Sequence, residues 1–237
     1  NAERRMTAAG WRSWRSAIAE QIAMEKAAAI PPYATVISGA QDPAVQTVLD
    51  ETCRKQQANL TWVQPLESSW ELGLAGEIQR SNAAVALGAL KALSSLGWTL
   101  PEAVIREGFA TARWPGRLET VRWREHRLRL DGAHNPPAAM QLAEERVHWT
   151  NASMGVVWIL AIQAHKDAAA MLQALLQPQD QAWIIPVPGH KSWCRAALLK
   201  ELPDRGNQLQ EADSLETVLN QLNSDGWPTP MPIVAGS

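Results

Sequence analysis

The stretch RLRLDGAHNP, residues 127–136, decides the fold. Its first half predicts a strand that ends at Asp131, a tight Gly-Ala turn follows, and His134-Asn135-Pro136 leads into a helix. In parallel α/β sheets, ligands bind at the carboxyl ends of strands, and the N-termini of helices there offer unpaired N–H groups. We therefore expect a ligand site where this strand ends.

The chemistry of Asp131 leaves two interpretations open. A carboxylate at the edge of a sheet can accept hydrogen bonds from ribose hydroxyls. Alternatively, Asp131 only caps the following helix and Asn135 only stabilises a turn. The residues alone do not decide between the two.

Just upstream, the segment Arg113-Trp-Pro-Gly-Arg117-Leu118 ends a run of helical character. A rigid Pro-Gly turn that presents Arg117 suits phosphate recognition, because a guanidinium is permanently charged and can bind in a bidentate manner. The alternative is an ordinary solvated arginine in a linker. The change of character at this point predicts a boundary between a first domain, residues 1–112, and a second, residues 113–237.

Outward from these turns, helices and strands alternate along the chain. The continuous apolar run VVWILAI, residues 156–162, is typical of a buried parallel strand. Helical crossovers between such strands predict an α/β fold with a parallel sheet covered on both faces. The expected helices are 13–30, 42–57, 82–96, 101–112, 137–147, 168–176, 195–202 and 214–223, and the expected strands are 35–39, 61–63, 118–123, 127–131, 156–162, 182–187 and 232–235.

Composition excludes several classes of protein. Apolar residues make up 46% of the chain and charged residues 19%, a balance that can fill a sizeable core. The net charge of -2 argues against non-specific nucleic-acid binding, and no apolar run reaches the roughly 18 residues that a membrane span needs. Cys53 and Cys194 lie far apart and suit a reducing cytoplasm rather than a disulfide framework or a metal site. We expect a cytoplasmic protein without nucleic-acid or membrane partners.

Together, WPGRL at residues 114–118 and DGAHNP at 131–136 resemble motifs of folylpolyglutamate synthase and dihydrofolate synthase, a branch of the Mur ligase superfamily. The likeness covers nearly the whole chain, with its segments in the right order. The other similar segments are IAMEKA at 22–27, GEIQRSNA at 76–83, AHKD at 164–167 and IVAGS at 233–237.

This resemblance implies an architecture and a reaction. Residues 1–112 would be a remnant of the central P-loop-type ATPase domain, and residues 113–237 a Rossmann-like Mur ligase C-terminal domain with a mostly parallel sheet. ATP would phosphorylate a carboxylate of folate or dihydropteroate, with Mg²⁺ present. The amine of L-glutamate would then displace phosphate from the acyl phosphate. The family also suggests a monomer.

By the same resemblance, five residues become site candidates. Asn82, Arg117 and Asp131 would contact ATP, with Arg117 on phosphate and Asp131 on ribose. Lys26 matches a lysine that is carbamylated in the family, which gives an anionic group that helps to hold Mg²⁺. His134 would lie beside the nucleotide, and Lys26 and His134 are the two catalytic candidates.

The pattern departs from the family near the start of the chain. There is no GxxxxGK[ST] phosphate loop, and Gly10–Trp14 lacks the histidine that family members use for magnesium. We therefore expect an N-terminally truncated chain, with its last strand also cut, that is incomplete as an enzyme by itself. Two alternatives stay open: a peptidoglycan-precursor ligase, which the form of the motifs disfavours, and a non-catalytic nucleotide-binding homologue.

Overall fold

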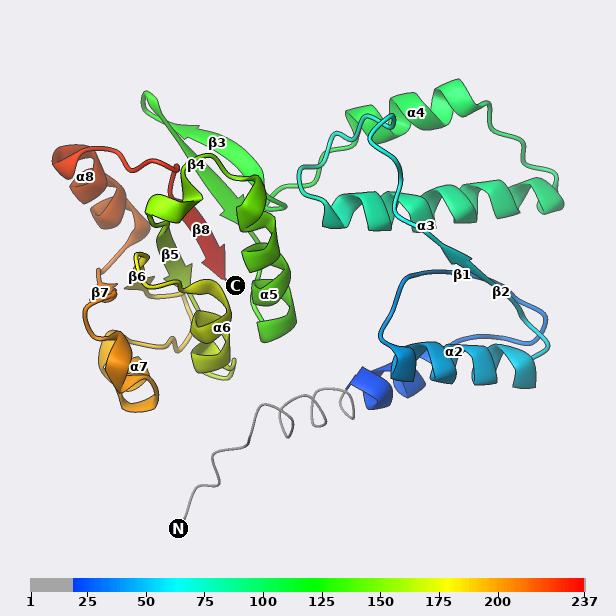
Figure 1. Cartoon of the computed structure of the whole chain (residues 1–237), viewed down its shortest axis with the longest axis horizontal. Helices are drawn as coiled ribbons and strands as arrows, with labels where there is room; N and C mark the ends of the chain where they lie inside the picture. Colours follow the sequence, from blue (N-terminus) through cyan, green and yellow to red (C-terminus); the bar gives the residue numbers. More distant parts are fainter. Residues whose placement is uncertain (1–18, 237) are drawn as a thin grey trace, which may run out of the picture. The chain divides into compact units, whose positions relative to one another are not determined.

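The computed structural model describes residues 19–236, which form two compact units (Figure 1). Unit 1 runs up to Gly73 and resumes with Ile78–Thr111, and unit 2 consists of Leu74–Glu77 together with the chain from Ala112 onward. Residues 19–27 are helical, as expected, but the helix predicted over 13–30 ends earlier, because residues 28 and 29 form a turn. Residues 13–18, the Gly10–Trp14 segment and Ser237 lie outside the described residues. None of the described helices is long and apolar enough to cross a membrane.

Unit 1 is built on two parallel strands, β1 (Thr35–Gly39) and β2 (Asn59–Val63), which α2 (Pro43–Lys55) connects. The helix α2 begins as the sequence predicts, because Pro43 occupies its first turn and the Asp42 side chain accepts a hydrogen bond from the Ala44 N–H at 2.9 Å. The remaining helices are α3 (Ile78–Ala92), a short 3-10 turn η1 (Leu93–Leu96) and α4 (Glu102–Thr111).

The helix α3 packs closely on this strand pair because Gly88 has no side chain. A Cβ at that position would lie 2.6 Å from a methyl carbon of Ile37 in β1. The predicted helix 82–96 is therefore present, but it starts four residues earlier and its last four residues tighten into η1. Gly97 ends it in the left-handed conformation, with φ 85°, as expected of a C-cap glycine.

Unit 2 contains a six-stranded sheet in the order β3-β4-β8-β5-β6-β7. Only β3 and β4 pair antiparallel, and every other pair is parallel, which confirms the mostly parallel sheet. The strands are β3 (Glu119–Trp123), β4 (His126–Asp131), β5 (Val157–Ala161), β6 (Gln181–Ile185), β7 (Leu209–Glu211) and β8 (Ile233–Gly236), and the helices are α5 (Pro136–Glu144), α6 (Ala168–Leu175), α7 (Arg195–Glu201) and α8 (Leu215–Asp225).

Two apolar clusters cover the two faces of this sheet. Trp158 and Leu160 of β5 point to the face covered by α5, α6 and α7, whereas Ile159 between them points to the face covered by α8. This alternation along one strand is the reason why the run of residues 156–162 is apolar without interruption. Both faces of the sheet are therefore covered by helices, as the sequence predicts.

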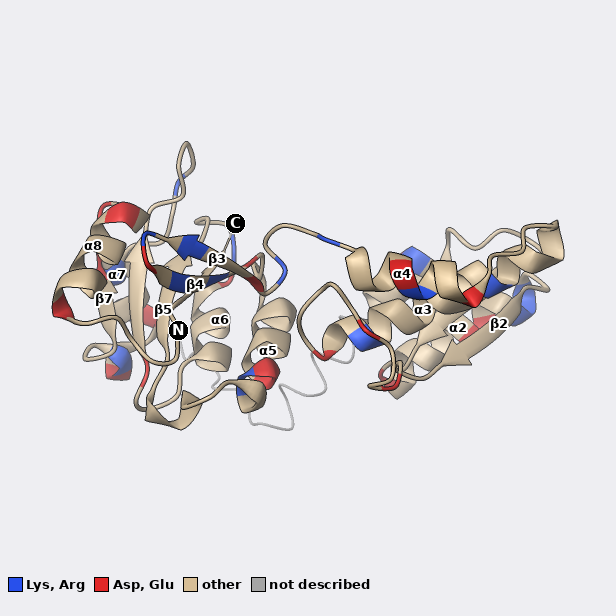
Figure 2. Ribbon diagram, turned by 90° about the horizontal axis from the view of Figure 1, so that it is seen from above, with Lys and Arg blue, Asp and Glu red and all other residues tan. Residues whose placement is uncertain are grey.

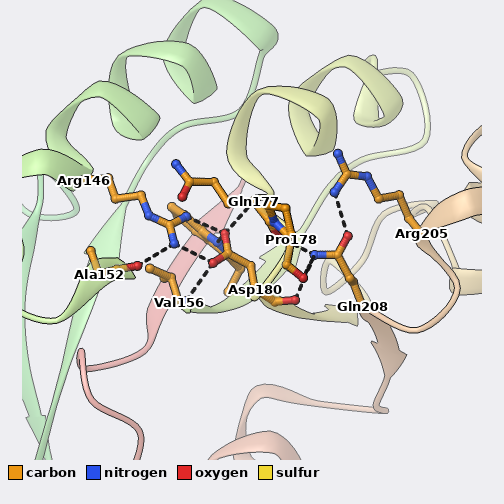
Figure 3. Close-up of polar contacts among 9 residues, drawn as sticks. Arg146, Ala152, Val156, Gln177, Pro178, Asp180, Arg205 and Gln208 are labelled. Carbon is orange, nitrogen blue, oxygen red and sulfur yellow. Dashed lines mark hydrogen bonds and ion pairs between the residues drawn. The ribbon is translucent and has the colours of Figure 1, made fainter. Parts of the chain in front are cut away.

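A buried ion pair fastens the edge of the sheet where β5 and β6 begin (Figure 3). Asp180 is fully buried and accepts hydrogen bonds from both terminal nitrogens of Arg146, at 2.6 and 2.7 Å. It also accepts from the backbone of Val156 and Gln177 and from the indole of Trp158. This cluster joins η2 (Glu145–His148), the 3-10 turn that follows α5, to β5 and β6 at the edge opposite the predicted ligand site.

Candidate functional site

The two motif turns lie against each other at the carboxyl end of β4. The Gly132 N–H donates to the Gly116 carbonyl at 2.7 Å, so the backbone of one turn is bonded to the other. Asp131 adds a second link, because its Oδ2 accepts from the Leu118 N–H at 3.0 Å and its Oδ1 from the Ala133 N–H at 2.9 Å. The structure thus brings Arg117 and Asp131 to one place, although the motifs are separated by the whole β3–β4 hairpin.

The conformation of the first turn depends on its glycine. Gly116 adopts φ 70°, a left-handed conformation that favours glycine, and its N–H donates to the Glu119 carboxylate at 2.9 Å. Leu118, also at positive φ, is buried in the core beneath the turn. The turn is therefore fixed from both sides while Arg117 between them stays exposed.

Asp131 is a partly buried carboxylate with acceptor capacity left over. Burial raises its pKa, Glu145 raises it further, and the two backbone N–H groups and the Arg117 charge act in the opposite direction. Each carboxylate oxygen accepts one hydrogen bond from the protein, and each can accept another. Asp131 is not the cap of α5, because Asn135 takes that place; the structural role of Asp131 is to hold the two turns together.

Asn135 and His134 organise the start of α5. The Asn135 side chain accepts from the Ala138 N–H at 3.0 Å, which makes it the N-cap of that helix. The His134 Nδ1 lies 2.8 Å from the Gly132 carbonyl, which can only accept, so Nδ1 carries a proton in this contact. Nε2 lies 3.4 Å from the Asn135 amide nitrogen on the exposed side of the turn.

The other two candidates belong to unit 1. Asn82 is exposed in the second turn of α3, and its amide donates to Gln79 at 3.0 Å. Lys26 is exposed on the helix of residues 19–27, and its ammonium lies 3.6 Å from the Glu25 carboxylate. The structure therefore brings together Arg117, Asp131 and His134 within unit 2, and it places Lys26 and Asn82 in unit 1.

The side chains described for residues 19–236 do not form a ready-made metal site. Among them there is no group of three or more His, Cys, Asp or Glu residues that could hold an ion. The residues present thus do not fit a protein-enclosed Mg²⁺ site. Magnesium is commonly held by substrate phosphates and water with one or two carboxylates.

Two further loops lie at the same edge of the sheet, and only the first of them was singled out from the sequence. The AHKD segment follows β5, and residues 186–193 follow β6. They are joined by the Ala164 N–H to the Lys191 carbonyl at 2.8 Å and by the Trp193 indole to the Lys166 carbonyl at 2.9 Å. The loop of residues 186–193 was not singled out from the sequence. It could have been, because this loop follows an apolar strand as AHKD does, and ligands in α/β sheets bind at the carboxyl ends of strands.

The mostly parallel six-stranded sheet, covered by helices on both faces, defines an α/β protein, and solved structures of folylpolyglutamate synthases with the Mur ligase fold share this architecture. A family model described as "Dihydrofolate synthetase, C-terminal domain" matches residues 117–236, which is more than half of the chain. The chain belongs to the folylpolyglutamate synthase and dihydrofolate synthase family.

Curated relatives agree with this assignment. Folylpolyglutamate synthase of Lacticaseibacillus casei is 33% identical over 123 residues, which is 52% of this chain and 28% of that protein. Dihydrofolate synthetase of Saccharomyces cerevisiae is 30% identical over 188 residues, which is 68% of this chain and 43% of that protein. The chain thus spans less than half the length of these two relatives.

Solved structures show the same fold over nearly all of the chain. Mycobacterium tuberculosis folylpolyglutamate synthase, complexed with ADP and AMPPCP, superposes with a TM-score of 0.78 at 25% identity and covers 92% of this chain and 57% of that one. The bifunctional folylpolyglutamate synthase/dihydrofolate synthase of Yersinia pestis, complexed with AMPPNP and a manganese ion, has a TM-score of 0.72 at 23% identity over 92% of this chain and 54% of that one.

Proposed function

We propose that the protein is an ATP-dependent acid–amino-acid ligase that adds L-glutamate to a carboxylate of folate or dihydropteroate. The family supports the reaction, and the nucleotide complexes of the mycobacterial relative support ATP as its co-substrate. The observation that carries the proposal for this chain is the joined pair of turns at the carboxyl end of β4. There, Asp131 and Arg117 are held side by side by backbone hydrogen bonds.

Each of these residues has a role that its geometry allows. The free acceptor positions of Asp131 would receive the ribose hydroxyls, and the exposed guanidinium of Arg117 would bind phosphate oxygens. His134 would line the nucleotide beside them. In the first step the γ-phosphoryl group passes to a carboxylate oxygen of the acceptor and ADP leaves. In the second, the glutamate nitrogen bonds to the acyl carbon, phosphate leaves and the amine loses a proton.

The remaining assignments are part of the same proposal. Residues 1–112 would belong to the central ATPase domain, with Asn82 contacting ATP and Lys26 acting as a carbamate near the metal, and residues 113–237 would form the glutamate-ligase domain. The metal would be Mg²⁺, held chiefly by the phosphates. The two free thiols, Cys53 and Cys194, are compatible with a monomer in the reducing cytoplasm.

Calorimetric titration with ATP tests this site. We expect Asp131→Asn to weaken ATP binding by about 10- to 100-fold, because a hydrogen bond to a charged group contributes about 1.5–3 kcal/mol. The same substitution should hardly change the affinity for 2′,3′-dideoxy-ATP, which lacks the hydroxyls that Asp131 would bind. Arg117→Gln should weaken ATP more than AMP.

Two exposed residues of unit 2 serve as matched controls. Asp213→Asn and Lys200→Gln make the same changes of charge elsewhere on the surface, and both should bind ATP like the unmodified chain. Equal affinity of Asp131→Asn for ATP and its dideoxy analogue would remove the ribose role. Binding that is indifferent to both site substitutions would refute the nucleotide site.

A further inference from the structure

The β3–β4 hairpin carries a concentration of arginine that the proposed nucleotide site does not use. Residues 117–129 include five arginines and two glutamates, in a chain whose net charge is -2. Figure 2 marks Lys and Arg positions in blue on the ribbon of both strands. Three of them, Arg122, Arg127 and Arg129, make up what we call the arginine face.

The register of the hairpin sets like charges against each other. Arg122 of β3 is the cross-strand partner of Arg127 of β4, so their Cβ atoms lie about 4.5–5.5 Å apart. Side chains alternate along β4, so Arg127 and Arg129 share one face, opposite Leu128, which packs with α8. Arg122 and Arg127 are exposed, and within residues 19–236 their side chains have no ion pair or hydrogen bond. The arrangement destabilises the free protein.

Arg129 has a buried hydrogen-bond donor that no described residue satisfies, which is independent evidence that this face binds an acceptor. Its Nε is buried and makes no hydrogen bond with any of the described residues, and its guanidinium lies over the Trp149 ring at 5.0 Å. Burial and the neighbouring Arg127 lower its pKa, and Glu145 acts in the opposite direction. An anion bound beside the Arg129 guanidinium would stabilise its positive charge and could accept a hydrogen bond from its Nε.

Protection of a sheet edge does not account for the whole arginine face. Charged side chains on an edge strand prevent sheets from associating, and Arg122 on the edge strand β3 would serve that purpose. Arg127 and Arg129, however, lie on β4, which is paired on both sides. Their charges need another explanation.

We propose that the arginine face binds a chain of carboxylates, the γ-linked glutamyl tail of the acceptor. The identity of this ligand rests on the proposed function, because each turnover of such a ligase adds one carboxylate to the tail. Arg127 and Arg129 are two residues apart, about 6.6 Å along the strand, and they lead to Asp131 at the proposed nucleotide edge. A glutamyl tail that lies along Arg127 and Arg129 would place its carboxylates beside these guanidinium groups, and it would reach the end of β4 at Asp131.

Fluorescence anisotropy with labelled γ-linked pentaglutamate, which carries no pteridine, tests this inference on the purified chain. We expect the pentaglutamate to compete far better than free glutamate and its binding to weaken as salt rises. The double variant Arg122→Gln/Arg127→Gln should bind at least tenfold more weakly. Lys55→Gln/Lys200→Gln removes the same charge from exposed helix positions and should bind normally.

The stability of the free chain adds a readout that a purely structural role would not give. Since Arg122 and Arg127 repel each other, the arginine double variant should melt at the same or a higher temperature than the unmodified chain while it loses binding. A lower melting temperature, or unchanged binding of pentaglutamate, would overturn the inference. A short oligonucleotide that binds more tightly than pentaglutamate would also overturn it. These outcomes do not affect the ATP titration of Asp131→Asn. The arginine face and the proposed nucleotide site are therefore tested by separate experiments.

Discussion

Asp180 shows how much of unit 2 depends on one buried carboxylate. Five donors converge on it, and Arg146 would be left as an uncompensated buried charge without it. We expect Asp180→Asn to lower the free energy of unfolding by about 3–5 kcal/mol, the range for breaking a buried pair. Urea unfolding measures this, with the exposed Asp204→Asn as a control that should change it by less than about 0.5 kcal/mol.

The same residue predicts a dependence on pH. Burial alone would raise the pKa of Asp180, but the Arg146 guanidinium, the backbone N–H groups and the Trp158 indole outweigh it and lower the pKa on balance. The ionised form therefore stabilises the folded state at pH values above about 4, where an unfolded aspartate ionises, and this is lost as the pH falls through the lower folded value. Asp180→Asn should flatten this acid limb of the stability curve. An unchanged acid limb would show that other groups cause it.

At the residue scale, sequence reasoning singled out Asp131 as a site candidate but did not predict its bonding. Asp131 stands out in the sequence because an acidic residue ends a strand and precedes a glycine turn. Nothing in the sequence shows that it bonds to Leu118, because that contact depends on the register of the β3–β4 hairpin. The buried Asp180 was not foreseen, since its partners Arg146, Val156 and Gln177 meet only when the sheet forms.

Among the elements, the two capped helices of unit 2 allow a matched experiment. Asn135 caps α5 at the proposed site, and Ser214 caps α8, where its hydroxyl accepts from the Thr217 N–H at 3.1 Å. Alanine at either position should lower stability by a similar amount, about 0.5–2 kcal/mol. Only Asn135→Ala should also weaken ATP binding, because it loosens the turn beside Asp131. Equal ATP affinities of the two variants would argue that the start of α5 has no part in the site.

Elements with strong local signals were predictable, and weak ones were not. The strand β5 is an unbroken apolar run, and α8 begins at a serine cap, so both were expected close to their observed bounds. The strand β7 was missed because it has only three residues, Leu209–Glu211, and exists through its pairing with β6. Pairing of this kind is a property of the folded sheet and leaves little trace in a short segment.

On the scale of the whole molecule, the sheet of unit 2 separates the Asp180 cluster from the proposed nucleotide site. The Asp180 cluster fastens the edge where β5 and β6 begin, whereas the paired turns lie where β4 ends. Because parallel strands share one direction, these are opposite edges of the same sheet. The parallel order was predictable from the alternation of helices and apolar strands. The position of β8 between β4 and β5 was not, because strand order depends on long-range packing.

The most direct test of the central claim is an NMR titration of the ¹⁵N-labelled chain with ATP. We expect the largest shifts at the amides of Leu118, Gly132 and Ala133, which bond the two turns together. The amides of Val156 and Gln177 around Asp180 should remain unchanged. Shifts confined to the Asp180 edge, or no shift at the paired turns at saturating ATP, would contradict the account.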